Sequence, residues 1–219
     1  MRIKSIVIIV ALFALSSCSV IAPVVFGLRQ IDGYNAEQCA KFYKKLPNDF
    51  AFTPLVCDKE QFWQVSNLGA DSMQMHDLYQ PLKIMYFHDD TLVSLHINCY
   101  CPPTLTFNLS WNYKHQFDVF PPSTSVAVDS YTLKRSDMQA IFPEIKGESD
   151  YTVLVFWTDM LHKISRSEIK TVYRNLKKHG PAILEPAVPE PVEGPLGSKV
   201  EVYLINNDIP LSKLVSETE

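Results

Sequence analysis

Hydrophobic and polar positions recur along this chain with the period of a helix in some stretches and the period of a strand in others. In residues 35–120, three stretches with helical spacing come first, and each begins with Asn or Asp at the position that caps a helix. Strand-like stretches follow, and two of them flank the polar pair Asp89-Asp90, which is typical of a hairpin. The expected helices cover 35–46, 58–69 and 71–79, and the expected strands cover 82–88, 91–99 and 105–113.

The pattern in residues 121–219 predicts a parallel crossover. Tyr151–Trp157 is an apolar run rich in β-branched and aromatic residues, which indicates a strand covered on both faces. The next helix is expected to begin at Ser165 and to form a capping box with Glu168. A strand, a helix and a second strand in this order imply a right-handed connection. The other expected elements are a strand at 125–133, a short helix from 136 and a strand at 199–206.

These elements together predict an α/β fold with a mixed sheet, in which antiparallel hairpins are combined with one parallel strand–helix–strand crossover. The chain has 219 residues, 47% of them hydrophobic, so it can bury a sizeable core. A Pro-rich segment at 181–195 is expected to be an extended surface loop. The net charge is −4 and no basic run occurs, so we expect no nucleic-acid partner.

The N-terminus has the layout of an export signal over residues 1–17. Arg2 and Lys4 form a short positive region, and an uninterrupted apolar run of ten residues, Ile6–Leu15, follows. A membrane-spanning helix needs roughly 20 apolar residues, so this run is too short to span a bilayer. The sequence therefore predicts a cleaved signal peptide.

The segment Leu15-Ser16-Ser17-Cys18 resembles the lipobox of bacterial lipoproteins. The resemblance implies cleavage before Cys18 and attachment of acyl chains to its thiol and new amino group, which would hold the protein in a lipid bilayer. Ser at position 19 goes with sorting to the outer membrane in enteric bacteria. Residues 18–34 are then expected to form a tether to a body in the periplasm or at the cell surface.

Four cysteines remain beyond the predicted anchor, at positions 39, 57, 99 and 101. An even number in an exported protein is consistent with two disulfides, for which three connectivities exist. Cys99 and Cys101 end a strand-like run and are expected on the same face as Val93, Leu95 and Ile97. One interpretation is structural, with free buried thiols or bridges to the other two cysteines. The alternative is a redox or metal-binding Cys-x-Cys pair.

No metal site or cofactor is expected. A zinc site would need a second pair of Cys or His ligands, which the sequence lacks. The predicted hairpin places His88 opposite Thr91 and His96 opposite Lys83, too far apart for one metal ion. Phosphate-loop, dinucleotide-binding and zinc-protease motifs do not occur.

Residues 125–208 resemble part of the thioredoxin-like family. The run TVLVFWTDML, a helix and the run VEVYLINND follow the family's strand ending in Phe-Trp, its active-site turn, its helix and a strand ending near an Asp. In that family the turn holds a Cys-x-x-Cys, and the corresponding positions here are Leu161 and Ile164. The resemblance therefore implies a degenerate thioredoxin-like core without the redox cysteines.

Asp159 and His162 flank the start of the same helix, three residues apart. They could form an acid–base pair with His162 as the base and Asp159 orienting it, although Asp before a helix is also common for capping. We expect a non-catalytic binding, assembly or scaffold role with an envelope protein as partner. The alternative is an envelope thiol–disulfide protein that uses Cys99 and Cys101. A hydrolase built on Asp159 and His162 is the third hypothesis.

Overall fold

The computed structural model describes residues 28–105, 108–181 and 199–216. The predicted signal peptide, Cys18, residues 18–27 of the tether and residues 182–195 of the Pro-rich segment lie outside these ranges. Among the helices that are described, none combines the length and apolar character needed to cross a membrane.

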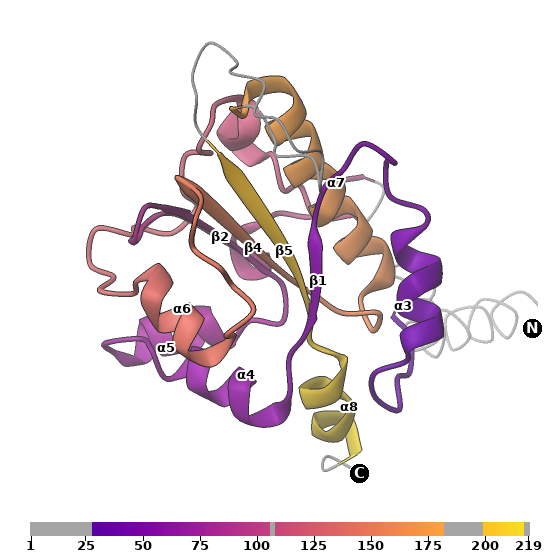
Figure 1. Cartoon of the computed structure of the whole chain (residues 1–219). Coiled ribbons are helices and arrows are strands. Elements are labelled where there is room, and N and C mark those ends of the chain that lie inside the picture. Colours follow the sequence, from indigo (N-terminus) through magenta and orange to yellow (C-terminus); the bar gives the residue numbers. More distant parts are fainter. Residues whose placement is uncertain (1–27, 106–107, 182–198, 217–219) are drawn as a thin grey trace, which may run out of the picture.

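One five-stranded sheet forms the centre of the molecule, with the strand order β1-β5-β4-β2-β3 (Figure 1). β4 pairs in parallel with β5, and β5 in parallel with β1, whereas β2 runs antiparallel to both β4 and β3. The predicted α/β fold with a mixed sheet, an antiparallel hairpin and a parallel crossover is therefore confirmed. The strands are β1 (Thr53–Val56), β2 (Lys83–His88), β3 (Thr91–Ile97), β4 (Tyr151–Trp157) and β5 (Val200–Asn206).

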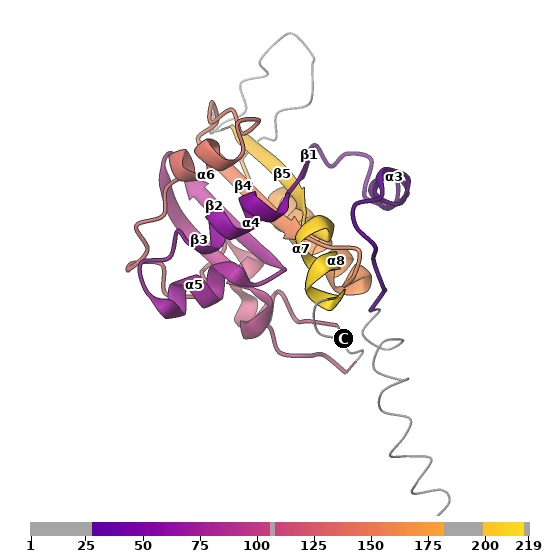
Figure 2. The ribbon, with the colours of Figure 1, turned by 90° about the horizontal axis from the view of Figure 1, so that it is seen from below.

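Helices cover both faces of this sheet (Figures 1 and 2). α3 and α7 pack on one face, and α4, α5 and α6 pack on the other, so that two separate apolar clusters enclose the strands. The α-helices are α3 (Ala36–Tyr43), α4 (Lys59–Ser66), α5 (Ser72–Tyr79), α6 (Arg135–Ile141), α7 (His162–His179) and α8 (Asp208–Ser216), and the 3-10 segments are η1 (Asn98–Tyr100) and η2 (Tyr113–Asp118).

β4 is the central strand, and its sequence explains its position. Val155 and Trp157 point to the cluster on the α7 face, while Leu154 and Phe156 point to the cluster on the α4 face. All four side chains are fully buried. A continuous apolar run is what a strand covered on both faces requires, so the prediction for Tyr151–Trp157 is confirmed.

The predicted helix starts in the first half are also correct. Asn35 caps α3, Asp58 forms a capping box with Gln61 at α4, and Asp71 caps α5. In each case the side-chain oxygen accepts a hydrogen bond from a backbone amide that has no partner within the helix.

The hairpin β2–β3 forms as predicted, but its register differs. His96 pairs with Ile84 rather than with Lys83, because a shift in the ladder leaves Val93 without a partner. Val93 consequently packs against the α7 face, whereas Leu95 belongs to the opposite cluster. The prediction that these two residues share a face is therefore wrong.

Two predicted strands do not form. The described residues of 105–113 contribute one isolated bridge, between Leu109 and Pro103, and the buried Trp111 lies in a turn before η2. Residues 125–133 are irregular. Trp111 and Leu133 are buried without strand pairing, whereas Leu105 is fully exposed. Alternation of apolar and polar residues alone cannot distinguish these arrangements from a strand.

α7 begins at His162, with Leu161 at its N-cap position, four residues before the predicted cap at Ser165. The hydroxyl of Ser165 donates to the backbone oxygen of Thr158, at 2.8 Å, instead of capping the helix. Glu168 is fully buried, and neither of its carboxyl oxygens has a hydrogen-bond partner among the described residues. The predicted capping box between Ser165 and Glu168 is therefore wrong, because both residues lie inside the helix and face the sheet.

Burial raises the pKa of Glu168 well above the value of an exposed carboxyl group. Folded Glu168 therefore keeps its proton at pH values where the unfolded chain has lost it, and the free energy of unfolding falls as the pH rises above about 4.3. We expect Glu168→Gln to raise the free energy of unfolding at pH 7 and to flatten its pH dependence. Urea denaturation at several pH values measures both effects.

Glu144→Gln is the matched control, because Glu144 is exposed and its substitution should leave the unfolding curve unchanged. A Glu168→Gln variant with an unaltered pH dependence would show that the buried carboxyl group does not titrate as its burial requires.

Candidate functional site

The carboxyl ends of β4 and β5 meet the start of α7 at one edge of the sheet. This edge is where open α/β folds usually bind their ligands. Four charged or titratable side chains gather here, from parts of the chain that are far apart in sequence: Arg29, Asp159, His162 and Asp208.

Asp208 follows β5 as the first residue of α8 and is almost completely buried. Its Oδ1 accepts hydrogen bonds from the Thr158 hydroxyl, at 2.7 Å, and from the Asp159 amide, at 2.8 Å. Its Oδ2 accepts from Asn206 Nδ2 at 2.9 Å. Burial raises the pKa of Asp208 and the neighbouring Asp159 adds to this, while the hydrogen bonds oppose it. Asp208 thus joins the end of β5 to the turn that follows β4.

Asp159 is paired on two sides. Its carboxylate accepts from His162 Nδ1 at 2.7 Å and from Arg29 Nη1, which lies 3.1 Å from each oxygen. Partial burial acts to raise the pKa of Asp159, but the hydrogen bonds from His162 and Arg29 outweigh it and hold the pKa below its usual range. The structure therefore brings Asp159 and His162 together, as the acid–base hypothesis requires.

The imidazole ring of His162 packs against aromatic side chains. It makes an edge-type contact with the Phe42 ring, at 5.4 Å between ring centroids, and Phe42 stacks on Trp157 at 4.4 Å between ring centroids. The side chain of His162 is 13% exposed. Ser165, the nearest serine along the helix, has its hydroxyl engaged with Thr158. The pair is well oriented, but Ser165 is not positioned as a nucleophile beside it.

The chain's own N-terminal segment is docked on this edge. Leu28 forms an isolated bridge with Leu161, and the amide of Arg29 donates to the backbone oxygen of Met160 at 2.9 Å. With the Arg29–Asp159 ion pair, these contacts fix the described end of the predicted tether across the first turn of α7. Sequence reasoning did not find Arg29, because 130 residues separate it from Asp159.

The four candidate thiols are free, and no two of them form a disulfide. Burial raises the pKa of the Cys39, Cys57 and Cys101 thiols to about 12 each. Cys99 is exposed on η1, whereas Cys101 is buried, so the prediction that the two share one face of a strand is wrong. The reason is that the strand ends at Ile97 and the chain turns. Thiols with a raised pKa carry little thiolate at neutral pH and are poor nucleophiles.

Within the described ranges, no group of three or more His, Cys, Asp or Glu side chains is arranged to hold a metal ion. His88 stacks on Tyr151, at 4.5 Å between ring centroids, while His96 packs on Phe117 at 4.4 Å. Burial lowers the pKa of His96 to about 3, so this ring is neutral and belongs to the core.

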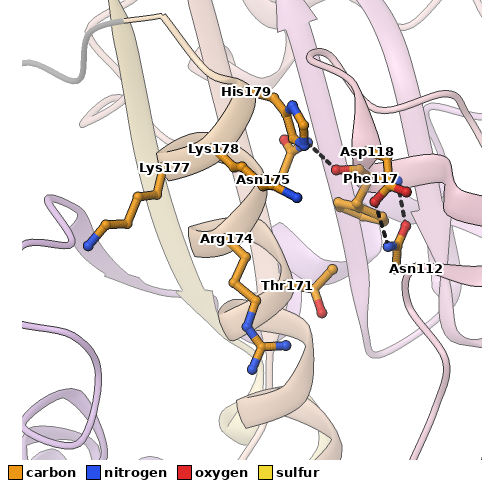
Figure 3. A pocket seen from close by; sticks show the side chains of 9 residues that line it. All are labelled: Asn112, Phe117, Asp118, Thr171, Arg174, Asn175, Lys177, Lys178 and His179. Carbon is orange, nitrogen blue, oxygen red and sulfur yellow. Dashed lines mark hydrogen bonds between the residues drawn. The ribbon is translucent and has the colours of Figure 1, made fainter.

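A cavity of about 470 Å³ lies between η2 and the C-terminal half of α7 (Figure 3). One wall is a polar stripe on α7 with helical spacing, and the other comes from η2. The helical spacing of the residues on the α7 wall can be seen in the sequence. The η2 wall could not be predicted, because part of it falls in the segment 105–113 expected to be a strand. The lining residues are Asn112, Phe117, Asp118, Thr171, Arg174, Asn175, Lys177, Lys178 and His179.

Comparisons of the chain with models of protein families, with curated proteins and with solved structures gave no match.

Arg29→Gln should release the N-terminal segment from the start of α7 while the body stays folded. The Arg29–Asp159 pair is half-exposed on the Arg29 side, and a pair of this kind contributes about 1 kcal/mol, so amide exchange at residues 28–31 should speed up about fivefold. Hydrogen exchange followed by mass spectrometry measures this directly. Asp32→Asn, an exposed change in the same segment, is the control and should not alter the exchange. Unchanged exchange in Arg29→Gln would mean that the ion pair does not hold the segment.

Proposed function

We propose that this chain is an exported bacterial lipoprotein and that its folded body has a non-catalytic binding, assembly or scaffold role. The positive region, the short apolar run and the lipobox-like Leu15-Ser16-Ser17-Cys18 support export and acylation of Cys18. Ser at position 19 supports the outer membrane as the destination. The body then lies in the periplasm or at the cell surface, with an envelope protein as its partner.

The observation that carries this proposal is the docking of the N-terminal segment on the carboxyl edge of β4 and β5. An enzyme of this architecture would use that edge for its substrate. Here the segment that leads from the proposed anchor lies at the carboxyl ends of β4 and β5, and its Arg29 forms an ion pair with the carboxylate of Asp159. The arrangement is that of an attachment point rather than of an open catalytic cleft.

The docked segment also supports a position of the body close to the bilayer. Ten residues separate Cys18 from Leu28, and a chain of that length spans at most about 35 Å. Because Leu28 is held at the start of α7, that end of the helix stays within this distance of the lipid. A scaffold or binding protein gains a defined orientation from such a short connection.

A degenerate thioredoxin-like core is part of the proposal. β4, α7 and β5 form the parallel unit that the resemblance implies, and the hairpin β2–β3 pairs with β4 on the side opposite β5. In the family the hairpin follows the parallel unit, whereas here it precedes it in the chain. A thiol–disulfide role is not favoured, because Leu161 and Ile164 stand at the positions of the redox cysteines and the Cys101 thiol is buried.

Cys18→Ala should abolish acylation and release the protein from the membrane fraction, since the acyl chains supply the binding to lipid. Mass spectrometry of the membrane-extracted protein and cell fractionation test this. Cys99→Ser, at an exposed cysteine of the body, is the control and should remain acylated and membrane-bound. A Cys18→Ala chain that still resists extraction with alkali would overturn the proposed anchor.

The non-catalytic role predicts that the purified full chain does not hydrolyse ester, phosphoester or glycoside test substrates. His162→Gln is the decisive variant, because the Asp159–His162 pair is the arrangement here best suited to acid–base catalysis. Hydrolysis by the wild-type chain that disappears in His162→Gln would contradict the proposal. Arg29→Gln, which removes the other partner of Asp159, tests whether displacement of the docked segment uncovers an activity.

A further inference from the structure

The cavity between η2 and α7 has no part in the attachment just described, because it lies near the opposite end of the helix. Thirteen residues separate His162 from Asn175, which corresponds to about 20 Å along the helix axis. Its volume of about 470 Å³ falls in the range of small-molecule sites. A ligand bound there would therefore be well separated from the docked N-terminal segment.

The α7 wall is built from residues that helical spacing places on one side of the helix: Thr171, Arg174, Asn175 and Lys178. Arg174 makes no hydrogen bond or ion pair with any residue in the part of the chain that the structure describes. Arg174 and Lys178 are four residues apart, a spacing at which like charges repel each other on a helix. An anion between them would remove that repulsion.

Lys177 provides a useful contrast. Its Nζ lies 2.6 Å from Asp49 Oδ2, and Figure 3 shows its side chain turned away from η2. Its charge is therefore compensated within the protein. The cationic groups that remain for the cavity are Arg174, Lys178 and, when protonated, His179, opposed by the single carboxylate of Asp118.

The helix dipole accounts for only some of these cations. Basic residues in the last turn, Lys177, Lys178 and His179, are favoured there for that reason alone. Because the dipole effect fades within one turn, it does not explain Arg174, which precedes that turn. The cavity is the feature that Arg174 and Lys178 share.

The opposite wall is held in place by Asn175, which is buried. Its Nδ2 donates to the backbone oxygens of Phe117, at 2.8 Å, and Val119, at 2.7 Å, and its Oδ1 accepts from the Tyr86 hydroxyl at 3.3 Å. These bonds fix η2 against α7, so the cavity exists before any ligand arrives. Binding therefore requires no rearrangement of η2, and the conformational entropy lost is that of the ligand and of the exposed cationic side chains.

η2 also contains strained backbone. Lys114 and His115 both have positive φ, at 54° and 61°, a conformation that residues with side chains seldom adopt. The turn brings His115 Nδ1 within 2.8 Å of Asp118 Oδ2, while Asn112 Nδ2 donates to Asp118 Oδ1 at 2.9 Å. Asp118 is thereby oriented at the rim of the cavity, with lone pairs left to accept from a hydroxyl group.

We propose that this cavity binds a small phosphate ester, with the phosphate between Arg174 and Lys178 and a hydroxyl group of the ligand donating to Asp118. The two cations of Arg174 and Lys178 match the charge of a phosphate monoester, and the Arg guanidinium presents paired donors to its oxygens. The Thr171 hydroxyl is a further donor on the same wall. The inference rests on the proposed binding role, and adds to it the site and the ligand class.

The test uses the full chain in detergent and isothermal titration with glycerol phosphate, with neutral glycerol as the matched probe. We expect saturable binding of glycerol phosphate, none of glycerol, and a loss of affinity of at least about tenfold in Arg174→Gln or Lys178→Gln, as for a charge-assisted hydrogen bond. Lys170→Gln, the same charge change on α7 outside the cavity, should bind like the wild type. An unfolding curve for each variant confirms that it is folded.

A second arm separates a soluble ligand from a lipid headgroup. Vesicles of phosphatidylglycerol, compared with vesicles of phosphatidylcholine, are mixed with the Cys18→Ala chain. Binding of free glycerol phosphate without recruitment to vesicles assigns a soluble ligand, and recruitment that Arg174→Gln abolishes assigns a headgroup.

The proposal is overturned if the chain binds neither glycerol phosphate nor phosphatidylglycerol vesicles. It is also overturned if Arg174→Gln and Lys178→Gln bind glycerol phosphate as well as Lys170→Gln does. Such a result would leave the proposed membrane attachment untouched, because acylation of Cys18 is measured separately.

Discussion

The buried carboxylate of Asp208 is the constraint on which the edge of the sheet depends. It accepts hydrogen bonds from Thr158, Asp159 and Asn206, and so holds the ends of both parallel strands in one position. The same bonds place a second carboxylate, that of Asp159, close by, and two buried acids of like charge destabilise each other. Arg29 and His162 offset this by pairing with Asp159. The Asp208 hydrogen bonds that join the ends of β4 and β5 thus place Asp159 where it needs a cation. The ion pair between Asp159 and Arg29, which helps to dock the N-terminal segment, meets this need.

The sheet also explains why the two halves of the sequence form one body. β4 and β5 come from the second half, but β1 pairs with β5 and β2 pairs with β4, so strands of the first half flank the parallel pair on both sides. Neither half could bury β4 alone, since Leu154 packs against helices of the first half while Val155 faces α7. Residues 35–120 and 121–219, which the sequence pattern distinguishes, therefore contribute to one core.

Features with a local cause could be predicted from the sequence. The caps at Asn35, Asp58 and Asp71 and the strand Tyr151–Trp157 follow from side chains within a few residues, as does the Asp159–His162 pair. Features set by distant contacts could not. β1 is four residues long, and its apolar and polar residues do not alternate. It forms because its backbone pairs in parallel with β5. The shift in β3, the partner Arg29 and the η2 wall of the cavity depend in the same way on residues far away in the chain.

The two ends of α7 differ in how their charges are compensated, and this difference separates structure from ligand binding. At the first turn, Asp159 is paired with cations from the chain itself, and the N-terminal segment covers the pair. Near the last turn Lys177 is likewise paired, with Asp49, but Arg174 is not, although it faces a cavity whose walls Asn175 has already fixed. A charge compensated internally contributes to the stability or orientation of the fold. A charge left uncompensated beside such a cavity contributes little to stability and is available to a ligand of opposite charge.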